Sequence, residues 1–347
     1  MKQFAYVGCR TTKERNARGK GIRIFEIENG TWKPVGLLEG PVNPSYFCLN
    51  EAQDMLYTIH GDYSEVSAYR IQPDGNLVYC NTVGTHGTNP VHLVLDRSGK
   101  WLYVANLQTG AVSLIPVLKD GSLGKIKELY FISGNGGPGY ISHPHQTMLD
   151  RSGRWLAVPS QGRLQGVGKI TLFETNGTEG TLREHFAIKG RTGAEPRHCV
   201  FAPSNRFCYC VNEKDSTVAA YRFDENEGTL EPMQILTSLP EDYAGDGWAS
   251  AIDAEGTTLY VSNRKHDSVS VYHLYAETGR MSWMQNIKTG GEQPRFLTVS
   301  PDGEWVVAAN EVTDTIVCFK RNENGSLQEN PVVVETESPV CIVFKTR

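Results

Sequence analysis

Short runs in which hydrophobic and polar residues alternate recur along the whole chain and predict β-strands. Each unit opens with an alternating run after a proline, passes through a Gly or Asn turn, and continues with a Leu-Tyr-Val-like run that ends in a polar residue. A valine-rich alternating run and a Gly-Ser-Leu type of turn follow. No window has convincing helical periodicity, so each unit is predicted to contain four short antiparallel strands.

The unit repeats about every 50 residues. Residues 89–123, 195–230 and 293–327 share the plan most clearly, and three further segments follow it, namely 43–77, 143–182 and 248–281. The second strand of each unit is expected to end at a polar residue, namely His60, Asn106, Ser160, Asn212, Asn263 and Asn310. This period fits about seven times into 347 residues, and repeated four-stranded units form a β-propeller.

The seventh unit is split between the two ends of the chain. The run Ser338–Phe344 resembles a first strand, and the run Phe4–Gly8 resembles a second strand. Pairing them would close the ring and leave no exposed sheet edge. The sequence therefore predicts an all-β fold, a single seven-bladed β-propeller domain over residues 1–347 with four antiparallel strands in each blade.

Composition narrows the classes of function. The net charge of -5 gives no reason to expect binding to nucleic acid or to an anionic membrane. The first residues lack the apolar core of a signal peptide, and no apolar run is long enough to cross a membrane. The eight cysteines include no C-x-x-C pair, so free thiols in a cytoplasmic protein are expected. No metal or other cofactor is expected, and we predict a monomer or weak homodimer.

Propeller geometry selects a candidate site. The first strand of each blade lines the central channel and the second runs antiparallel beside it, so the start of one and the end of the other meet at the same mouth. The first-strand starts place there Tyr46, His92, His145, Gln146, Arg197, His198, Ser250, Arg295 and Cys341. The second-strand ends add His60, Asp62, Asn106, Gln161, Asn212, Glu213, Asn263, Arg264, Asn310 and Glu311. Three arginines around a narrow mouth favour a carboxylate or phosphate ligand.

Two chemical interpretations of this cluster are open. A glutamate flanked by arginines stays ionised and could act as a base, and a histidine could transfer a proton near neutral pH, which together could hydrolyse or close a lactone. Alternatively, Arg197 and Glu213 could pair only to close the blade ends, with structural histidines and turn-capping asparagines.

Two further segments have open interpretations. The basic segment Arg10–Lys20 could be a solvated loop or could lie over the funnel. The glycine-rich segment Gly134–Gly139 lacks the Lys-Ser/Thr of a P-loop and is interpreted as a connection between blades.

Several motifs together resemble the lactonase family of seven-bladed propellers. They are His143-Pro-His145-Gln146, Glu195-Pro-Arg197-His198, Val211-Asn212-Glu213, Asp246-Gly-Trp248-Ala-Ser250, Asn263-Arg264 and Gln293-Pro-Arg295-Phe296. That family includes the propeller type of bacterial 6-phosphogluconolactonase and the fungal carboxy-cis,cis-muconate cyclase. The resemblance implies catalytic residues at His145 (less favourably His143), Arg197, Glu213 and Arg264. Substrate-binding side chains are expected at His143, Gln146, His198, Asn212, Asn263 and Arg295.

The resemblance implies hydrolysis of a small anionic lactone, first of all 6-phosphogluconolactone of the pentose phosphate pathway. The arginines would bind phosphate or polarise the carbonyl, and Glu213 or His145 would activate water. One alternative is reversible lactonisation of a muconate-type or other sugar-acid lactone. Another is a non-catalytic ligand- or protein-binding propeller, which a large exposed apolar patch would favour.

Overall fold

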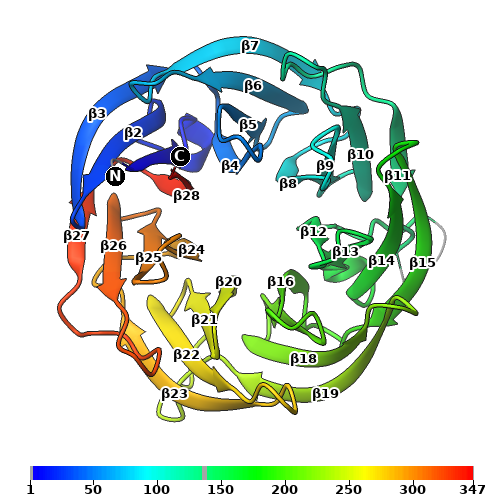
Figure 1. Cartoon of the computed structure of the whole chain (residues 1–347). Coiled ribbons are helices and arrows are strands. Elements are labelled where there is room, and N and C mark those ends of the chain that lie inside the picture. Colours follow the sequence, from blue (N-terminus) through cyan, green and yellow to red (C-terminus); the bar gives the residue numbers. More distant parts are fainter. Residues whose placement is uncertain (1–2, 135–138, 347) are drawn as a thin grey trace.

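Seven four-stranded antiparallel sheets form a ring around a central channel (Figure 1). The computed structural model describes residues 3–134 and 139–346. Blades 1 to 6 follow in chain order, from the sheet that begins with β4 to the one that begins with β24, and blade 7 joins the two ends of the chain in the order β28-β1-β2-β3. The predicted all-β, seven-bladed propeller is therefore confirmed.

The two inner strands of each blade match the predicted units. The innermost strands are β4 (Pro44–Leu49), β8 (Pro90–Leu95), β12 (Met148–Leu149), β16 (Pro196–Phe201), β20 (Ala249–Glu255), β24 (Pro294–Val299) and β28 (Pro339–Lys345). The second strands are β5 (Met55–His60), β9 (Trp101–Asn106), β13 (Trp155–Ser160), β17 (Phe207–Asn212), β21 (Thr258–Asn263), β25 (Trp305–Asn310) and β1 (Gln3–Cys9). The six predicted second-strand ends are confirmed.

The two outer strands complete each blade. The third strands are β6 (Glu65–Ile71), β10 (Ala111–Pro116), β14 (Lys169–Asn176), β18 (Thr217–Asp224), β22 (Ser268–Leu274), β26 (Thr315–Lys320) and β2 (Gly21–Glu28). The outermost strands are β7 (Leu77–Gly84), β11 (Glu128–Phe131), β15 (Thr181–Lys189), β19 (Thr229–Thr237), β23 (Met281–Lys288), β27 (Val332–Glu335) and β3 (Thr31–Glu39). Two short 3₁₀ helices, Lys13–Arg15 and Arg163–Gln165, lie in loops between strands.

The hydrophobic core lies between the blades rather than inside any one of them. Second strands such as β5, β17 and β21 are buried along their whole length, because a neighbouring blade covers each face. Tyrosines of these strands also fasten adjacent blades by donating to a glycine carbonyl, in the pairs Tyr6–Gly75, Tyr57–Gly121, Tyr209–Gly279 and Tyr260–Gly325. The blades are therefore held in a fixed order around the channel.

The ends of the chain close the ring, as the sequence predicts. Strand β1 pairs antiparallel with β28, from Phe4 opposite Lys345 to Gly8 opposite Cys341 (Figure 1). A Cβ atom on Gly8 would lie 2.1 Å from the carbonyl oxygen of Pro44 and 2.5 Å from Sγ of Cys341. Only glycine therefore fits where the closing strands approach blade 1.

Three smaller predictions have different outcomes. All eight cysteines are free in the structure. Residues 135–138 of the glycine-rich segment lie outside the described residues, so its interpretation as a connection stays a prediction. Within the described parts of the chain, no helix is long and apolar enough to cross a membrane.

Candidate active site

The pairing of first and second strands shifts by one residue near the start of the first strand in every blade. In blade 4, Pro196 lies opposite Asn212 whereas His198 lies opposite Val211, so Arg197 is the extra residue of a β-bulge. Equivalent shifts occur in the other six blades. A bulge turns its side chain out of the regular alternation. The residues at this position are Ser45, Val91, His145, Arg197, Ser250, Arg295 and Val340.

A second position in each blade is fixed by a repeated backbone hydrogen bond. The first residue after the second strand donates its N–H to the residue that precedes the first strand, at 2.9 to 3.1 Å. The accepting residue has a positive φ in all seven blades, between 41° and 62°. Residues at the donating position are Arg10, Gly61, Leu107, Gln161, Glu213, Arg264 and Glu311. The fold thus presents two rings of side chains at one mouth of the channel.

Most members of these two rings line a single cavity of about 560 Å³. Its cationic side chains are Arg10, Arg15, Arg163, Arg197, Lys214, Arg264 and Arg295, and its carboxylates are Glu195 and Glu213. The whole chain has a net charge of -5, so the cavity concentrates positive charge in a protein that is negatively charged overall. A partly enclosed site with this excess of guanidinium groups favours an anionic ligand.

Glu213 bridges two buried arginines, and we call Arg197, Glu213 and Arg264 the first Arg–Glu–Arg set. Its Oε2 lies 3.0 Å from Nε of Arg197, and its Oε1 lies 2.9 Å from Nη2 of Arg264. Gln161 also donates its side-chain amide to Oε2. Burial of Glu213 opposes ionisation, but Arg264 and Arg197 outweigh it and lower the pKa of Glu213 to about 2. Glu213 is therefore a carboxylate at neutral pH.

A cluster of neutral histidines lies beside this set. Nδ1 of His145 is 3.2 Å from Nε2 of His198, and Nη1 of Arg197 is 3.5 Å from the same nitrogen. Burial, and after it the charge of Arg197, lowers the pKa of both histidines well below 6.5. Both rings are therefore uncharged at neutral pH. His145 lines the cavity, and its Nε2 has no hydrogen-bond partner among the described residues.

Six of the predicted site residues come together on the cavity wall, namely His145, Arg197, His198, Glu213, Arg264 and Arg295. The other four predicted residues, His143, Gln146, Asn212 and Asn263, do not line it. Their contact with substrate stays a prediction, and each of the four also has a side chain or backbone group that serves the fold.

The structural contacts differ among these four residues. Asn212 donates to Thr217, and Asn263 donates to the backbone carbonyl of Ser238. Gln146 accepts the backbone N–H of Cys199. His143 is the positive-φ residue that precedes the first strand of blade 3, and its carbonyl accepts a backbone N–H from the second strand's end.

Trp248 and Glu195 line the cavity but were not predicted as site residues. Both are the positive-φ residues of their blades, and φ is 49° at the bulky Trp248. The Trp248 ring contacts three cations, with Nζ of Lys265 4.7 Å, Nζ of Lys214 5.5 Å and Cζ of Arg264 5.5 Å from its centroid. Aligning the residue before each first strand across the repeats would have identified this position.

The basic segment Arg10–Lys20 contributes to the cavity through its first half. Arg10 is 4% exposed and lines the cavity, and Arg15 lines it from the 3₁₀ helix Lys13–Arg15. Arg18 instead pairs with Asp314 on the rim. Of the two interpretations from the sequence, the structure places Arg10 and Arg15 over the funnel.

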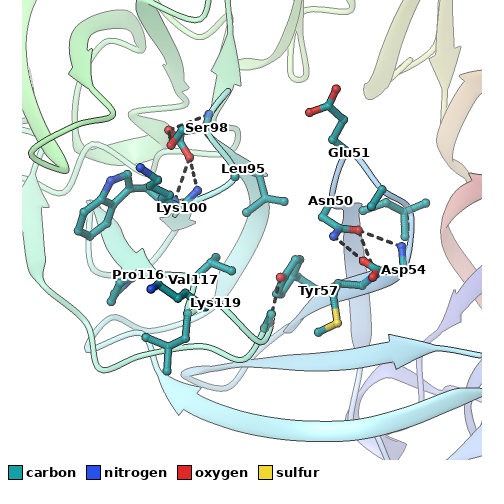
Figure 2. Close-up of a pocket in the computed structure, with 18 of the residues that line it drawn as sticks. Asn50, Glu51, Asp54, Tyr57, Leu95, Ser98, Lys100, Pro116, Val117 and Lys119 are labelled. Atoms are coloured by element: carbon teal, nitrogen blue, oxygen red, sulfur yellow. Dashed lines mark hydrogen bonds between the residues drawn. The ribbon is translucent and has the colours of Figure 1, made fainter.

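A second, larger cavity of about 1230 Å³ lies at the opposite ends of the strands in blades 1 and 2. Figure 2 shows that Asn50 and Asp54 are hydrogen-bonded to each other, and Tyr57 donates to the carbonyl of Gly121. These polar groups hold turns and blades together. The charged side chains of this cavity have both signs, including Glu51, Lys100 and Lys119, so it lacks the concentration of one charge found at the channel mouth (Figure 2).

Within residues 3–134 and 139–346, no group of three or more His, Cys, Asp or Glu side chains is arranged to hold a metal ion.

Comparisons with known proteins agree with this geometry. Residues 4–344 match the family model described as "Lactonase, 7-bladed beta-propeller". The chain is 28% identical over 351 residues to the 6-phosphogluconolactonase of Bacillus subtilis, covering 99% of this chain and 98% of that protein. It is 30% identical over 339 residues to the 6-phosphogluconolactonase of Pectobacterium carotovorum, with 94% of both chains covered.

A solved structure supports the same relationship. A crystal structure described as a putative 6-phosphogluconolactonase from Bacteroides fragilis superposes with a TM-score of 0.87 at 26% identity. The match covers 99% of this chain and 98% of that one. With its family model, its relatives and its blade architecture in agreement, the chain belongs to the Lactonase, 7-bladed beta-propeller family.

Proposed function

We propose that this lactone hydrolase converts 6-phosphogluconolactone to 6-phosphogluconate at the channel-mouth cavity. The curated relatives that match over nearly the whole chain are named 6-phosphogluconolactonases. The observation that carries the choice of an anionic lactone is the excess of seven cationic side chains over two carboxylates in the cavity lining. A phosphorylated sugar lactone supplies the negative charge that such a lining lacks.

The first Arg–Glu–Arg set suits the carbonyl of the lactone. Negative charge develops on the carbonyl oxygen when water attacks, and guanidinium donors fixed in position stabilise that charge. Glu213 keeps the side chains of Arg197 and Arg264 in place through its two ion pairs. With a pKa of about 2, Glu213 has low affinity for a proton. We therefore assign it a positioning role rather than the role of base.

His145 is the better candidate for the general base. In the tautomer whose Nδ1–H donates to Nε2 of His198, Nε2 of His145 carries a lone pair and can accept a proton. In the proposed reaction, water attacks the carbonyl carbon and passes its proton to Nε2 of His145. The bond between the carbonyl carbon and the ring oxygen then breaks, and the ring oxygen takes this proton to leave as a hydroxyl group. The product is the open-chain acid.

Substrate binding would strengthen this base. The positive charges of Arg197, Arg295 and Arg163 contribute to lowering the pKa of His145. A bound phosphate offsets part of that positive potential, so the pKa of His145 moves back toward its ordinary value once substrate is in place. The proton acceptor thus becomes more basic when the cavity is occupied.

A role in the pentose phosphate pathway follows from this substrate. The proposed reaction connects an oxidation that yields the lactone with later use of the free acid. We also propose a cytoplasmic location. All eight cysteines are free, although several lie on first and second strands that pack together, and cysteines generally stay reduced in the cytoplasm.

The assignment of roles can be tested by comparing hydrolysis rates of 6-phosphogluconolactone among single variants. His145→Asn should lower kcat by about 10² to 10⁴-fold as expected for loss of a general base. Arg197→Ala should lower kcat/KM by about 10² to 10³-fold as expected for loss of a donor to the developing oxyanion.

The matched control is Arg222→Ala, which removes an exposed arginine of the same blade that pairs with Glu231 on the surface. It should leave the rate unchanged. Full activity of both cavity variants would refute the site. Activity on a muconate-type lactone, with none on 6-phosphogluconolactone, would replace the substrate but keep the site.

A further inference from the structure

The first Arg–Glu–Arg set has a counterpart two blades further around the ring. Arg295 occupies the bulge position of blade 6, as Arg197 does in blade 4. Glu311 follows the second strand of that same blade, and Arg10 follows the second strand of the next blade. We call Arg295, Glu311 and Arg10 the second Arg–Glu–Arg set.

The backbone holds the two sets in the same way. The N–H of Glu311 donates to the carbonyl of Gln293 at 3.1 Å, and that of Arg10 donates to the carbonyl of Ser338 at 2.9 Å. These bonds belong to the sevenfold pattern that fixes Glu213 and Arg264. The fold therefore presents one arrangement of charges twice at the same mouth of the channel, and Arg10 and Arg295 of the second set line the cavity.

The second set is more loosely paired than the first. Nε of Arg10 lies 3.6 Å from Oε1 of Glu311, and Nε of Arg295 lies 3.9 Å from Oε2. The corresponding distances in the first set are 2.9 and 3.0 Å. In addition, Arg197 donates to the carbonyl of Ser250 at 2.7 Å, whereas the guanidinium of Arg295 donates no hydrogen bond among the described residues. Donors of the second set are therefore available to a ligand.

Arg10 supplies a second indication of a missing anion. Its side chain is 5% exposed, and its buried Nε has no hydrogen-bond partner among the described residues, as is also true of Nε of Arg197 and Nη2 of Arg264, but its carboxylate lies further away, at 3.6 Å. Its Nη1 lies 3.3 Å from Asp62, but Asp62 also pairs with Arg15. Three guanidinium groups here face only two carboxylates. A buried cation with an unused donor is costly unless a ligand completes its interactions.

Taken with the proposed function, on which this inference rests, these features divide the cavity into two halves. We propose that Arg10 and Arg295, held by Glu311, form the subsite for the phosphate group of the substrate, while the first Arg–Glu–Arg set acts on the lactone carbonyl. Guanidinium forks match the geometry of phosphate oxygens. The second set is the more loosely paired of the two, and the first set has the adjacent histidines that the chemistry needs.

The closing experiment measures binding without turnover. Isothermal titration calorimetry with 6-phosphogluconate and with gluconate should show about ten- to a hundredfold tighter binding of the phosphorylated acid to the unmodified protein, as expected for charge-assisted hydrogen bonds. Arg10→Gln should remove most of this difference and leave gluconate binding unchanged. Arg295→Gln should also remove most of the difference in affinity between the two acids. This second variant tests the subsite if Arg10→Gln fails to fold.

Lys20→Gln is the matched control, because this basic residue belongs to the same segment Arg10–Lys20 but is 66% exposed and lies 3.9 Å from Glu39. It should bind both acids like the unmodified protein. Undiminished binding of 6-phosphogluconate by both cavity variants, equal weakening for both acids, or no binding of either acid by the unmodified protein would overturn the subsite.

Kinetics separates this result from the proposed function. With 6-phosphogluconolactone, Arg10→Gln should raise KM about ten- to a hundredfold with little change in kcat. With unphosphorylated gluconolactone, its kcat/KM should stay within about twofold of the unmodified protein. If the protein hydrolyses neither lactone but binds 6-phosphogluconate through Arg10, the proposed function fails and the subsite stands.

Discussion

Replacing Glu213 with Gln should destabilise the protein at neutral pH as well as slow the reaction. The carboxylate is 16% exposed and lies within 3.0 Å of two buried guanidinium groups. Although burial opposes ionisation, Arg264 and Arg197 lower the pKa of Glu213 from 4.5 to about 2. At about 1.4 kcal/mol per pKa unit, this difference corresponds to about 3 kcal/mol of folding free energy at pH 7.

The pH dependence gives this prediction a distinctive form. Because the pKa of Glu213 is lower in the folded protein, the stabilisation is complete above the unfolded pKa and is lost as pH falls toward the folded pKa. Urea unfolding should show that Glu213→Gln is less stable than the unmodified protein by about 3 kcal/mol at pH 7 and by about half of that at pH 3.

Glu231→Gln is the matched control, since this glutamate of the same blade is 68% exposed and pairs with an exposed arginine. It should change the free energy of unfolding by less than about 0.5 kcal/mol at either pH. A loss below about 1 kcal/mol for Glu213→Gln at pH 7, or an equal loss at both pH values, would refute the electrostatic reasoning.

Two further predictions concern the base and the ring closure. Because the pKa of His145 lies well below 6.5, kcat/KM should stay constant from pH 8 to pH 6. A pH–rate profile in which kcat/KM falls with an inflection near 6.5 would contradict a neutral His145 as the base. Gly8→Ala should lower the free energy of unfolding by at least about 2 kcal/mol, because the new Cβ would overlap the carbonyl of Pro44. At Gly84 a new Cβ would have its nearest neighbouring atom 3.8 Å away, so urea unfolding of Gly84→Ala should show no comparable loss of unfolding free energy. Equal stability of the two variants would contradict the packing argument.

The arrangement of blades could be predicted from the sequence because the four-strand unit recurs about every 50 residues along the chain. Each second strand is a continuous apolar run that ends in a polar residue, and the ends from His60 to Asn310 were located correctly. The shortness of β12 was not predictable from the repeat alone. Pro159 is the last residue but one of the adjacent strand β13 and cannot donate a backbone hydrogen bond, so the pairing in blade 3 is interrupted there.

The site was less predictable, because the side chains of neighbouring residues at a strand end point in opposite directions. The sequence places Asn212 and Glu213 together at the channel mouth, but only Glu213 lines the cavity, while Asn212 turns to Thr217 on the third strand. The one-residue bulge that directs Arg197 leaves no clear mark in the hydrophobic pattern. Arg10 lies in a polar loop, and only the folded ring shows that it is equivalent to Arg264.

The central claim is that the channel-mouth cavity hydrolyses 6-phosphogluconolactone. Its most direct test is the rate of acid release at neutral pH from freshly generated 6-phosphogluconolactone, followed in a pH-stat with the unmodified protein, with Arg197→Ala and without protein. The account predicts a clear acceleration over the uncatalysed rate that is lost in Arg197→Ala. A rate equal to that without protein, or full activity in Arg197→Ala, would contradict it.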